Sequence, residues 1–258
     1  MGVGAELSAL SLALALSVHV IGGAPSDDAV VVCLSADTLP ICSGVVIGKR
    51  TVLTAGHCIN TVGPGVTYWV NFGADCRAPS SRVKVKSQRA HPQYTAEGAP
   101  FDLGLLELVS DVAVTPVALG TLAVDASLVG QPIRHVGYGA SSESPLAGWG
   151  TQRTVTHPLT RLDDDFLYSG DARFNTCTGD SGGPLFLGEA LLAVVSDGPD
   201  CHSEGHDQRI DRGREWIDAS MVEFEPAPPV MNVPKQGCSV GFALWTVLAA
   251  LLLLRRRR

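Results

Sequence analysis

One serine of this chain stands in a setting that suits a nucleophile. Ser181 lies in residues 177–184, which read Cys-Thr-Gly-Asp-Ser-Gly-Gly-Pro. A serine hydroxyl attacks a carbonyl efficiently only when a base accepts its proton and nearby donors stabilise the oxyanion. The small residues let the backbone turn sharply, so that successive N–H groups can face one point. The run therefore predicts a nucleophile beside an oxyanion site.

The same run also fits other interpretations. Residues 179–183 satisfy the Gly-x-Ser-x-Gly pattern of an α/β-hydrolase elbow, which would make the chain an esterase. A glycine-rich loop can also be purely structural. The elbow requires an acid and then a histidine after the serine, and Asp197, His202 and His206 do follow it. However, no alternation of strands and helices precedes the serine, as an α/β fold would require.

Two side chains of suitable chemistry precede Ser181. His57 follows apolar residues between 45 and 53, a pattern that predicts a strand ending at a histidine. Asp102 stands directly before the apolar run 103–108, which predicts the start of another strand. A histidine can act as a general base, and an aspartate can orient it. The order His, Asp, Ser differs from the order Ser, acid, His of α/β-hydrolases.

Four blocks in this order resemble the trypsin/chymotrypsin family of serine endopeptidases. They are Val20-Ile21-Gly22-Gly23, Thr54-Ala55-Gly56-His57-Cys58, Phe101-Asp102-Leu103-Gly104-Leu105-Leu106 and residues 177–185. The resemblance covers residues 20 to 222 and implies an all-β fold of two six-stranded antiparallel β-barrels with a C-terminal helix. Short apolar runs between glycine- and proline-rich turns agree with many short strands, and residues 211–222 predict the helix.

The resemblance implies a role for each residue of a catalytic site. Ser181 would be the nucleophile, His57 its base and then the acid for the leaving amine, and Asp102 would orient the imidazole. The backbone N–H groups of Gly179 and Ser181 would form the oxyanion hole, and the Ser196 hydroxyl would support Asp102. No cofactor or metal is implied. A catalytically silent binding protein is the alternative, but such homologues usually lose a triad member.

A second implied pair concerns activation. In the family, the aspartate before the nucleophile pairs with the α-amino group of the mature N-terminus; here these are Asp180 and Val20. That ion pair orders the oxyanion hole, and a buried carboxylate without its partner is costly. We therefore expect the unprocessed chain to be less active. His19 precedes Val20, so cleavage there differs from tryptic activation after a basic residue.

The resemblance also places a specificity pocket, formed by Asn175, Thr176, Gly198, Gly205 and Asp207. Asn175 stands at the pocket base, where trypsin-like members carry an aspartate, so it cannot bind lysine or arginine by charge. The two glycines match wall positions and leave room for a large side chain. Asp207 falls near the floor, where it would restore a negative charge or pair with Arg209 or His206. We expect a slight preference for large polar or basic residues.

Seven cysteines indicate an oxidising compartment if they pair. The resemblance implies the disulfides Cys42–Cys58 and Cys177–Cys201. Cys33 and Cys76 are then paired by elimination, and Cys238 remains odd. The remaining histidines His91, His135 and His157 are interpreted as surface or packing residues.

Charge and composition limit the partners. The formal net charge of −7 gives no electrostatic basis for binding nucleic acid. We expect a monomer that acts on protein or peptide substrates, with residues 20–224 as its peptidase domain.

The two ends differ from this domain. Residues 1–19 contain the apolar stretch Leu7–Leu16, which has the length of a secretory signal but lacks a basic n-region. We interpret them as a signal peptide or short pro-segment, with a buried N-terminal strand as the alternative. Residues 225–237 are proline-rich and predict an extended linker.

Residues 238–258 contain Cys238, an apolar run and four closing arginines. This order resembles the myxobacterial C-terminal sorting tail, which implies processing or lipidation at Cys238 by sorting machinery. A plain single-span membrane anchor is the alternative, although the run is short for a full span. The arginines should stay cytoplasmic. Under either interpretation, we expect the peptidase domain to be exported and to lie at the cell surface or outer membrane, or in the extracellular space.

Overall fold

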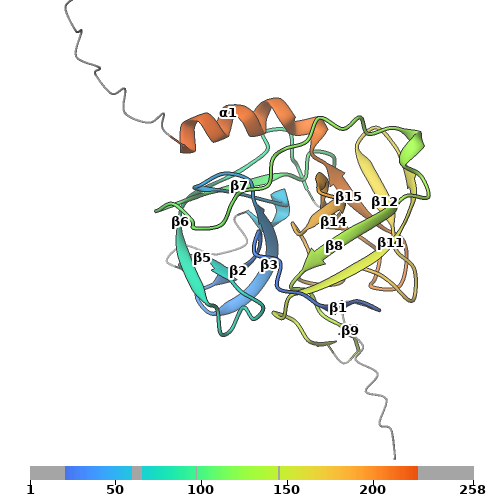
Figure 1. Cartoon of the computed structure of the whole chain (residues 1–258), viewed down its shortest axis with the longest axis horizontal. Helices are drawn as coiled ribbons and strands as arrows, with labels where there is room; N and C mark the ends of the chain where they lie inside the picture. The colour runs from blue at the N-terminus through green and yellow to red at the C-terminus, as the bar shows by residue number, and fades with distance from the viewer. Residues whose placement is uncertain (1–20, 60–65, 97, 145, 226–258) are drawn as a thin grey trace, which may run out of the picture. The chain divides into compact units, whose positions relative to one another are not determined.

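The computed structural model describes residues 21–59, 66–96, 98–144 and 146–225. Its strands form two closed six-stranded antiparallel barrels, and a helix follows them at the C-terminal end of the described residues (Figure 1). This arrangement confirms the predicted fold class. Val20, Cys238, the predicted signal and tail segments, and the predicted linker apart from Glu225 lie outside the described residues. Within the described ranges, no helix is long and apolar enough to cross a membrane.

The first barrel has the strand order β2-β3-β4-β7-β6-β5. Its strands are β2 (Val31–Ala36), β3 (Leu39–Val46), β4 (Thr51–Thr54), β5 (Tyr68–Phe72), β6 (Ser81–Ala90) and β7 (Gly104–Leu108). Antiparallel pairing of β2 with β5, with Leu34 opposite Val70, closes the barrel. Apolar side chains that include Val52 and Leu106 fill its interior.

The second barrel contains six strands, with β1 (Ala24–Pro25) added beside β11. These strands are β8 (Pro132–Gly137), β11 (Arg153–Leu162), β12 (Phe166–Ser169), β13 (Pro184–Leu187), β14 (Ala190–Asp197) and β15 (Gly205–Arg209). Pairing of β11 with β8 closes the barrel. Along β11 buried and exposed residues alternate, so Val155, His157 and Leu159 are all buried. A short hairpin, β9 (Ser142–Glu143) with β10 (Leu146–Ala147), lies between β8 and β11 in sequence.

A shared apolar cluster joins the barrels and the helix α1 (Arg214–Phe224). Ile217 and Phe224 are seven positions apart on one helical face, and both are fully buried in this cluster. The 3-10 turns η2 (Ala126–Leu128) and η3 (Asp211–Gly213) complete the fold, and η3 leads into α1, where the sequence predicts a helix.

All three predicted disulfides are present. They are Cys33–Cys76, Cys42–Cys58 and Cys177–Cys201. The first two lie in the first barrel and the third in the second. Each ties a loop to a distant segment and restricts the unfolded chain.

Candidate active site

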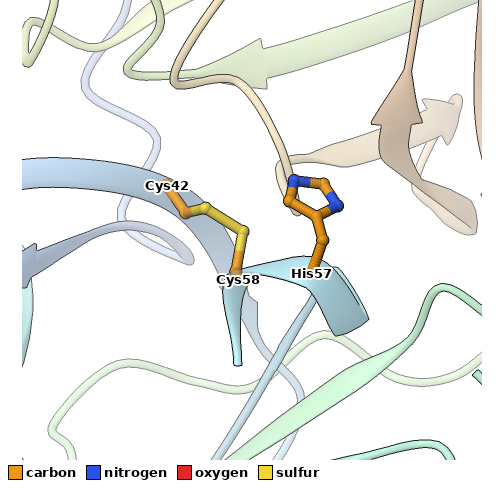
Figure 2. Close-up of side chains that lie close together, drawn as sticks. All are labelled: Cys42, His57 and Cys58. Carbon is orange, nitrogen blue, oxygen red and sulfur yellow. A yellow bond between two sulfur atoms is a disulfide. The ribbon is translucent and has the colours of Figure 1, made fainter. Parts of the chain in front are cut away.

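A short turn between the barrels positions His57. Strand β4 ends at Thr54, and the 3-10 turn η1 (Gly56–Cys58) then carries the histidine. The next residue, Cys58, is bonded to Cys42 on β3, so a disulfide holds the turn on its barrel (Figure 2). The predicted strand ending at a histidine is therefore present, with a turn at its end.

The carboxylate of Asp102 holds His57 at two points. Its Oδ2 lies 2.9 Å from Nδ1 of the imidazole, and its Oδ1 accepts the His57 backbone N–H at 2.8 Å. The Ser196 hydroxyl donates to the same Oδ2 at 2.6 Å. The backbone N–H of Asp102 donates to Oε1 of Gln208 at 3.1 Å. Gln208 lies on β15, so the second barrel also holds Asp102 in place. The arrangement fixes the plane of the ring and favours a proton on Nδ1.

The Asp102 carboxylate remains charged although it has no exposed surface. Burial raises its pKa, but the hydrogen bond and charge of His57 and the hydrogen bond of Ser196 outweigh this effect. The pKa of Asp102 therefore lies below its ordinary value. An ionised partner is what stabilises an imidazolium when His57 takes up a proton.

A strained residue precedes Asp102. Phe101 has a φ of 62°, a region that bulky side chains rarely adopt, and its carbonyl accepts the Leu103 N–H at 2.7 Å. Its ring stacks on His91, with centroids 4.6 Å apart. His91 thus has the predicted packing role, and it supports the loop that delivers Asp102 just before β7.

Ser181 and His57 line the same cleft, which has a volume of about 410 Å³. The turn around Ser181 lies against the first barrel because Gly182 has a φ of 77° and no side chain. A Cβ at Gly182 would overlap the Thr54 hydroxyl at the end of β4. Gly182 therefore lets the serine loop approach the histidine turn.

The two expected oxyanion donors also border this cleft. Gly179 has a φ of 98°, and a Cβ there would collide with the indole nitrogen of Trp149. Throughout the described ranges, no protein acceptor is hydrogen-bonded to the backbone N–H of Gly179 or of Ser181. Both donors are therefore available to an oxygen atom of a substrate.

Asp180 is buried behind the serine loop. Its carboxylate accepts the backbone N–H groups of Gly139 at 2.7 Å and Cys177 at 2.9 Å. Burial nevertheless raises the pKa of Asp180 to about 6. Ile21 is buried nearby, in one cluster with Cys177, and its carbonyl accepts the Asn175 N–H at 3.0 Å. The segment that follows Val20 is therefore packed against the serine loop.

Four of the five predicted specificity residues line the cleft, namely Asn175, Thr176, Gly198 and Gly205. The Asn175 side chain is buried; its amide donates to the Ser203 carbonyl at 2.6 Å and accepts the Thr176 N–H at 2.9 Å. A Cβ at Gly198 would lie 3.2 Å from the Cα of Gly205. The two glycines thus face each other, and side chains there would narrow the pocket.

Comparison with known proteins agrees with this geometry. The family model described as Trypsin matches residues 20–217. The chain belongs to the trypsin family. Trypsin Tyr p 3.0101 of Tyrophagus putrescentiae is 28% identical, and the match covers 76% of this chain and 77% of that protein. Transmembrane protease serine 9 of Rattus norvegicus is 27% identical over 84% of this chain, which spans 24% of that protein.

A solved structure shows the same fold. It is neuropsin, a serine protease expressed in the limbic system of mouse brain, with a TM-score of 0.67 and 24% identity. The match covers 77% of this chain and 98% of that one.

Asp207 departs from what the trypsin-family resemblance implies, because it does not line the cleft. Its carboxylate is buried in the second barrel, where Oδ1 lies 3.0 Å from Nε2 of His135 and Oδ2 accepts the Ser169 hydroxyl at 3.4 Å. Neither expected partner binds it: Arg209 pairs with Asp211, and His206 packs on aromatic rings. The predicted role of Asp207 in the pocket floor is therefore wrong.

The negative charge of this trypsin-family cleft comes from its rim instead. Glu143, Asp197 and Asp200 line it, and no lysine or arginine of the described residues does. Sequence reasoning missed Glu143 and Asp200, because neither the short strand β9 nor the loop that holds Asp200 matches a family motif.

The sulfurs beside His57 do not form a metal site. Ligand atoms of Cys42, His57 and Cys58 lie within 4.8 Å of one another. The two sulfurs are bonded to each other (Figure 2), so neither is the thiolate that a zinc site requires.

Proposed function

We propose that this chain hydrolyses peptide bonds through an acyl-enzyme, with Ser181, His57 and Asp102 as its triad. The observation that carries the proposal is that His57, held at 2.9 Å by an ionised Asp102, shares a cleft with Ser181 and two unoccupied backbone donors. Ser181 attacks the carbonyl while His57 accepts its proton, and Gly179 and Ser181 N–H groups stabilise the oxyanion. His57 then protonates the leaving amine, and a water molecule releases the acyl group by the same route.

A second serine stands near Asp102 but does not serve as the nucleophile. The Ser196 hydroxyl is buried and donates to the carboxylate itself. A proton donor to Asp102 cannot at the same time be deprotonated by His57. We assign Ser196 the supporting role and Ser181 the nucleophilic one.

The test uses the chain with its N-terminus freed at Val20 and labelled casein as the substrate. Wild type should release peptides, Ser181→Ala should lose activity, and Ser196→Ala should keep about a tenth of it. Loss of triad members in such enzymes lowers kcat by about 10⁶-fold. A Ser181→Ala protein as active as wild type would sink the assignment and revive the esterase or binding alternatives.

Activation by Val20 belongs to the same proposal. The buried Asp180, with its raised pKa of about 6, is an anion that gains from a cation. Ile21, the residue after Val20, packs in one cluster with Cys177, whose backbone N–H donates to Asp180. Chain freed at Val20 should be active, whereas chain with one extra residue before Val20, or with Ile21→Asp, should be much less so. Equal activity of the three proteins contradicts the ion pair.

The substrate preference follows from the cleft. A neutral Asn175 at the base and three carboxylates at the rim favour large polar or basic residues around the scissile bond. Profiling with a peptide library should show enriched lysine and arginine, and Asp197→Asn should weaken the enrichment. A library profile dominated by acidic residues would exclude this preference.

We also propose that the protein is exported and attached to the cell surface. Three disulfides support an oxidising location, and the apolar run and closing arginines of residues 238–258 support a sorting tail or anchor. Mass spectrometry of both termini of native protein should find the signal removed and Cys238 processed or modified. Intact termini in the cell interior would refute export.

A further inference from the structure

Ser43 lies on β3 of the first barrel and has no exposed surface. Its hydroxyl donates to the carbonyl of Gly179 at 2.9 Å and accepts the backbone N–H of Tyr138 at 2.9 Å. Its own backbone N–H donates to the carbonyl of Ser181 at 2.8 Å. One residue of the first barrel thus binds both residues whose N–H groups border the cleft.

The hydroxyl contact matters because it holds one of the two peptide planes that meet at Gly179. The N–H that faces the cleft lies in the plane before Gly179, whose Thr178 carbonyl accepts the Ala140 N–H at 2.8 Å, and the carbonyl that Ser43 binds lies in the plane after it. A glycine with a φ of 98° opposes rotation of one plane against the other only weakly, so contacts on both planes are needed to fix the direction of the N–H. Gly179 is buried, so its carbonyl has little access to water that could replace the serine hydroxyl. The Ser181 carbonyl is held by a backbone group and does not depend on the side chain at position 43.

We propose that Ser43 is a positioning residue that keeps Gly179 aimed at the developing oxyanion. The inference rests on the proposed peptidase function and adds a residue to it. Ser43 acts through Gly179, so its hydroxyl should matter more in the transition state than in substrate binding.

The chain offers a matched control in Ser35 on β2 of the same barrel. It is also buried, its hydroxyl donates to the Asp37 carbonyl at 3.3 Å, and it accepts from the Asn71 amide at 2.8 Å. Ser35 borders a different cavity from the one that contains Ser181. Removing either hydroxyl deletes one donated and one accepted hydrogen bond, but only Ser43 contacts the oxyanion loop.

The experiment compares wild type, Ser43→Ala, Ser43→Gly and Ser35→Ala, each freed at Val20. Active enzyme is counted with a fluorophosphonate probe, and kcat and KM are measured on one cleaved peptide. Inhibition by a peptide aldehyde, whose adduct has an oxygen in the oxyanion site, is compared with inhibition by the matching alcohol.

Both Ser43 variants should lose about tenfold in kcat and in aldehyde affinity, because one hydrogen bond to the loop is lost. KM and the affinity for the alcohol should stay within about twofold of wild type, because contacts that bind the ground state are left intact.

Several results would overturn the inference. A Ser43→Ala or Ser43→Gly protein with wild-type kcat removes the positioning role, and so does a change confined to KM. An equal loss of kcat in Ser35→Ala shows a general packing effect. Wild type that neither reacts with the probe nor cleaves peptide refutes the peptidase function itself. Labelled, active wild type with unchanged Ser43 variants refutes only the role of Ser43.

Discussion

The molecule contains two His–Asp pairs, and their geometry is nearly the same. In the cleft, Nδ1 of His57 lies 2.9 Å from Oδ2 of Asp102. Inside the second barrel, Nε2 of His135 lies 3.0 Å from Oδ1 of Asp207. In both pairs a serine hydroxyl also reaches the carboxylate.

Their surroundings differ. The His57 side chain is 18% exposed at a cleft that contains Ser181, whereas the His135 side chain is 3% exposed. The other nitrogen of His135 lies 3.2 Å from Nε2 of His157, and the two rings stack inside the barrel. A His–Asp pair is therefore a candidate catalytic site only where a nucleophile and a substrate can reach it. We expect the second pair to contribute to folding.

The largest expected effect is a loss of kcat when the His57–Asp102 pair is changed. Asp102→Asn should lower kcat by about 10⁴-fold, because a neutral amide favours the wrong tautomer of His57 and cannot stabilise its charged form. Steady-state hydrolysis with active-site titration measures this loss. A reduction of less than about tenfold would place Asp102 outside the mechanism.

The corresponding change in the second barrel should act on stability. Asp207→Asn breaks a buried pair and should lower the free energy of unfolding by about 3–5 kcal/mol. Urea denaturation gives this value, and kcat of the folded fraction should remain within about threefold of wild type. A stable Asp207→Asn protein with greatly reduced kcat would reverse the distinction between the pairs.

His157, which stacks on His135 of the second pair, should also make stability depend on pH. Burial, with a contribution from neighbouring His135, lowers the pKa of His157 to about 4, and its Nδ1 has no partner in the part of the chain that the structure describes. Because folding disfavours its protonation, His157 should destabilise the protein as the pH falls from about 6.5 towards 4. The loss should be on the order of 3 kcal/mol relative to His157→Gln. Urea denaturation of both proteins at each pH tests this, and parallel pH curves would contradict it.

The supporting serines give the smallest contrast. Ser196→Ala removes a 2.6 Å hydrogen bond to Asp102 and should lower kcat about tenfold, with the activity of the variant more sensitive to acid. Ser169→Ala removes a 3.4 Å contact to Asp207 and is the matched control, with kcat unchanged. Equal kcat values in the two variants would show that Ser196 does not support catalysis.

Local motifs explain why much of the site could be predicted. His57, Asp102 and Ser181 each stand in a short run that also determines the turn or loop around it. Helix α1 was predicted for the same reason, whereas two disulfides were implied by the family resemblance and Cys33–Cys76 was paired by elimination. All three predicted disulfides are present.

The rest depends on contacts that no local pattern contains. Asp207, His135 and His157 come from β15, β8 and β11, and they meet because strand register aims them at each other inside the barrel. A shift of one residue in β11 would turn His157 outward. The Ser43 hydroxyl likewise meets Gly179 only because the two barrels pack together.

The most direct test of the central claim is the site at which a fluorophosphonate probe becomes attached. Peptide mass spectrometry of labelled wild type freed at Val20 should find the adduct on Ser181, with labelling retained in Asp207→Asn and strongly slowed in Asp102→Asn. An adduct on Ser196, or labelling that is equally fast in Asp102→Asn and Asp207→Asn, would contradict the assignment of the catalytic pair.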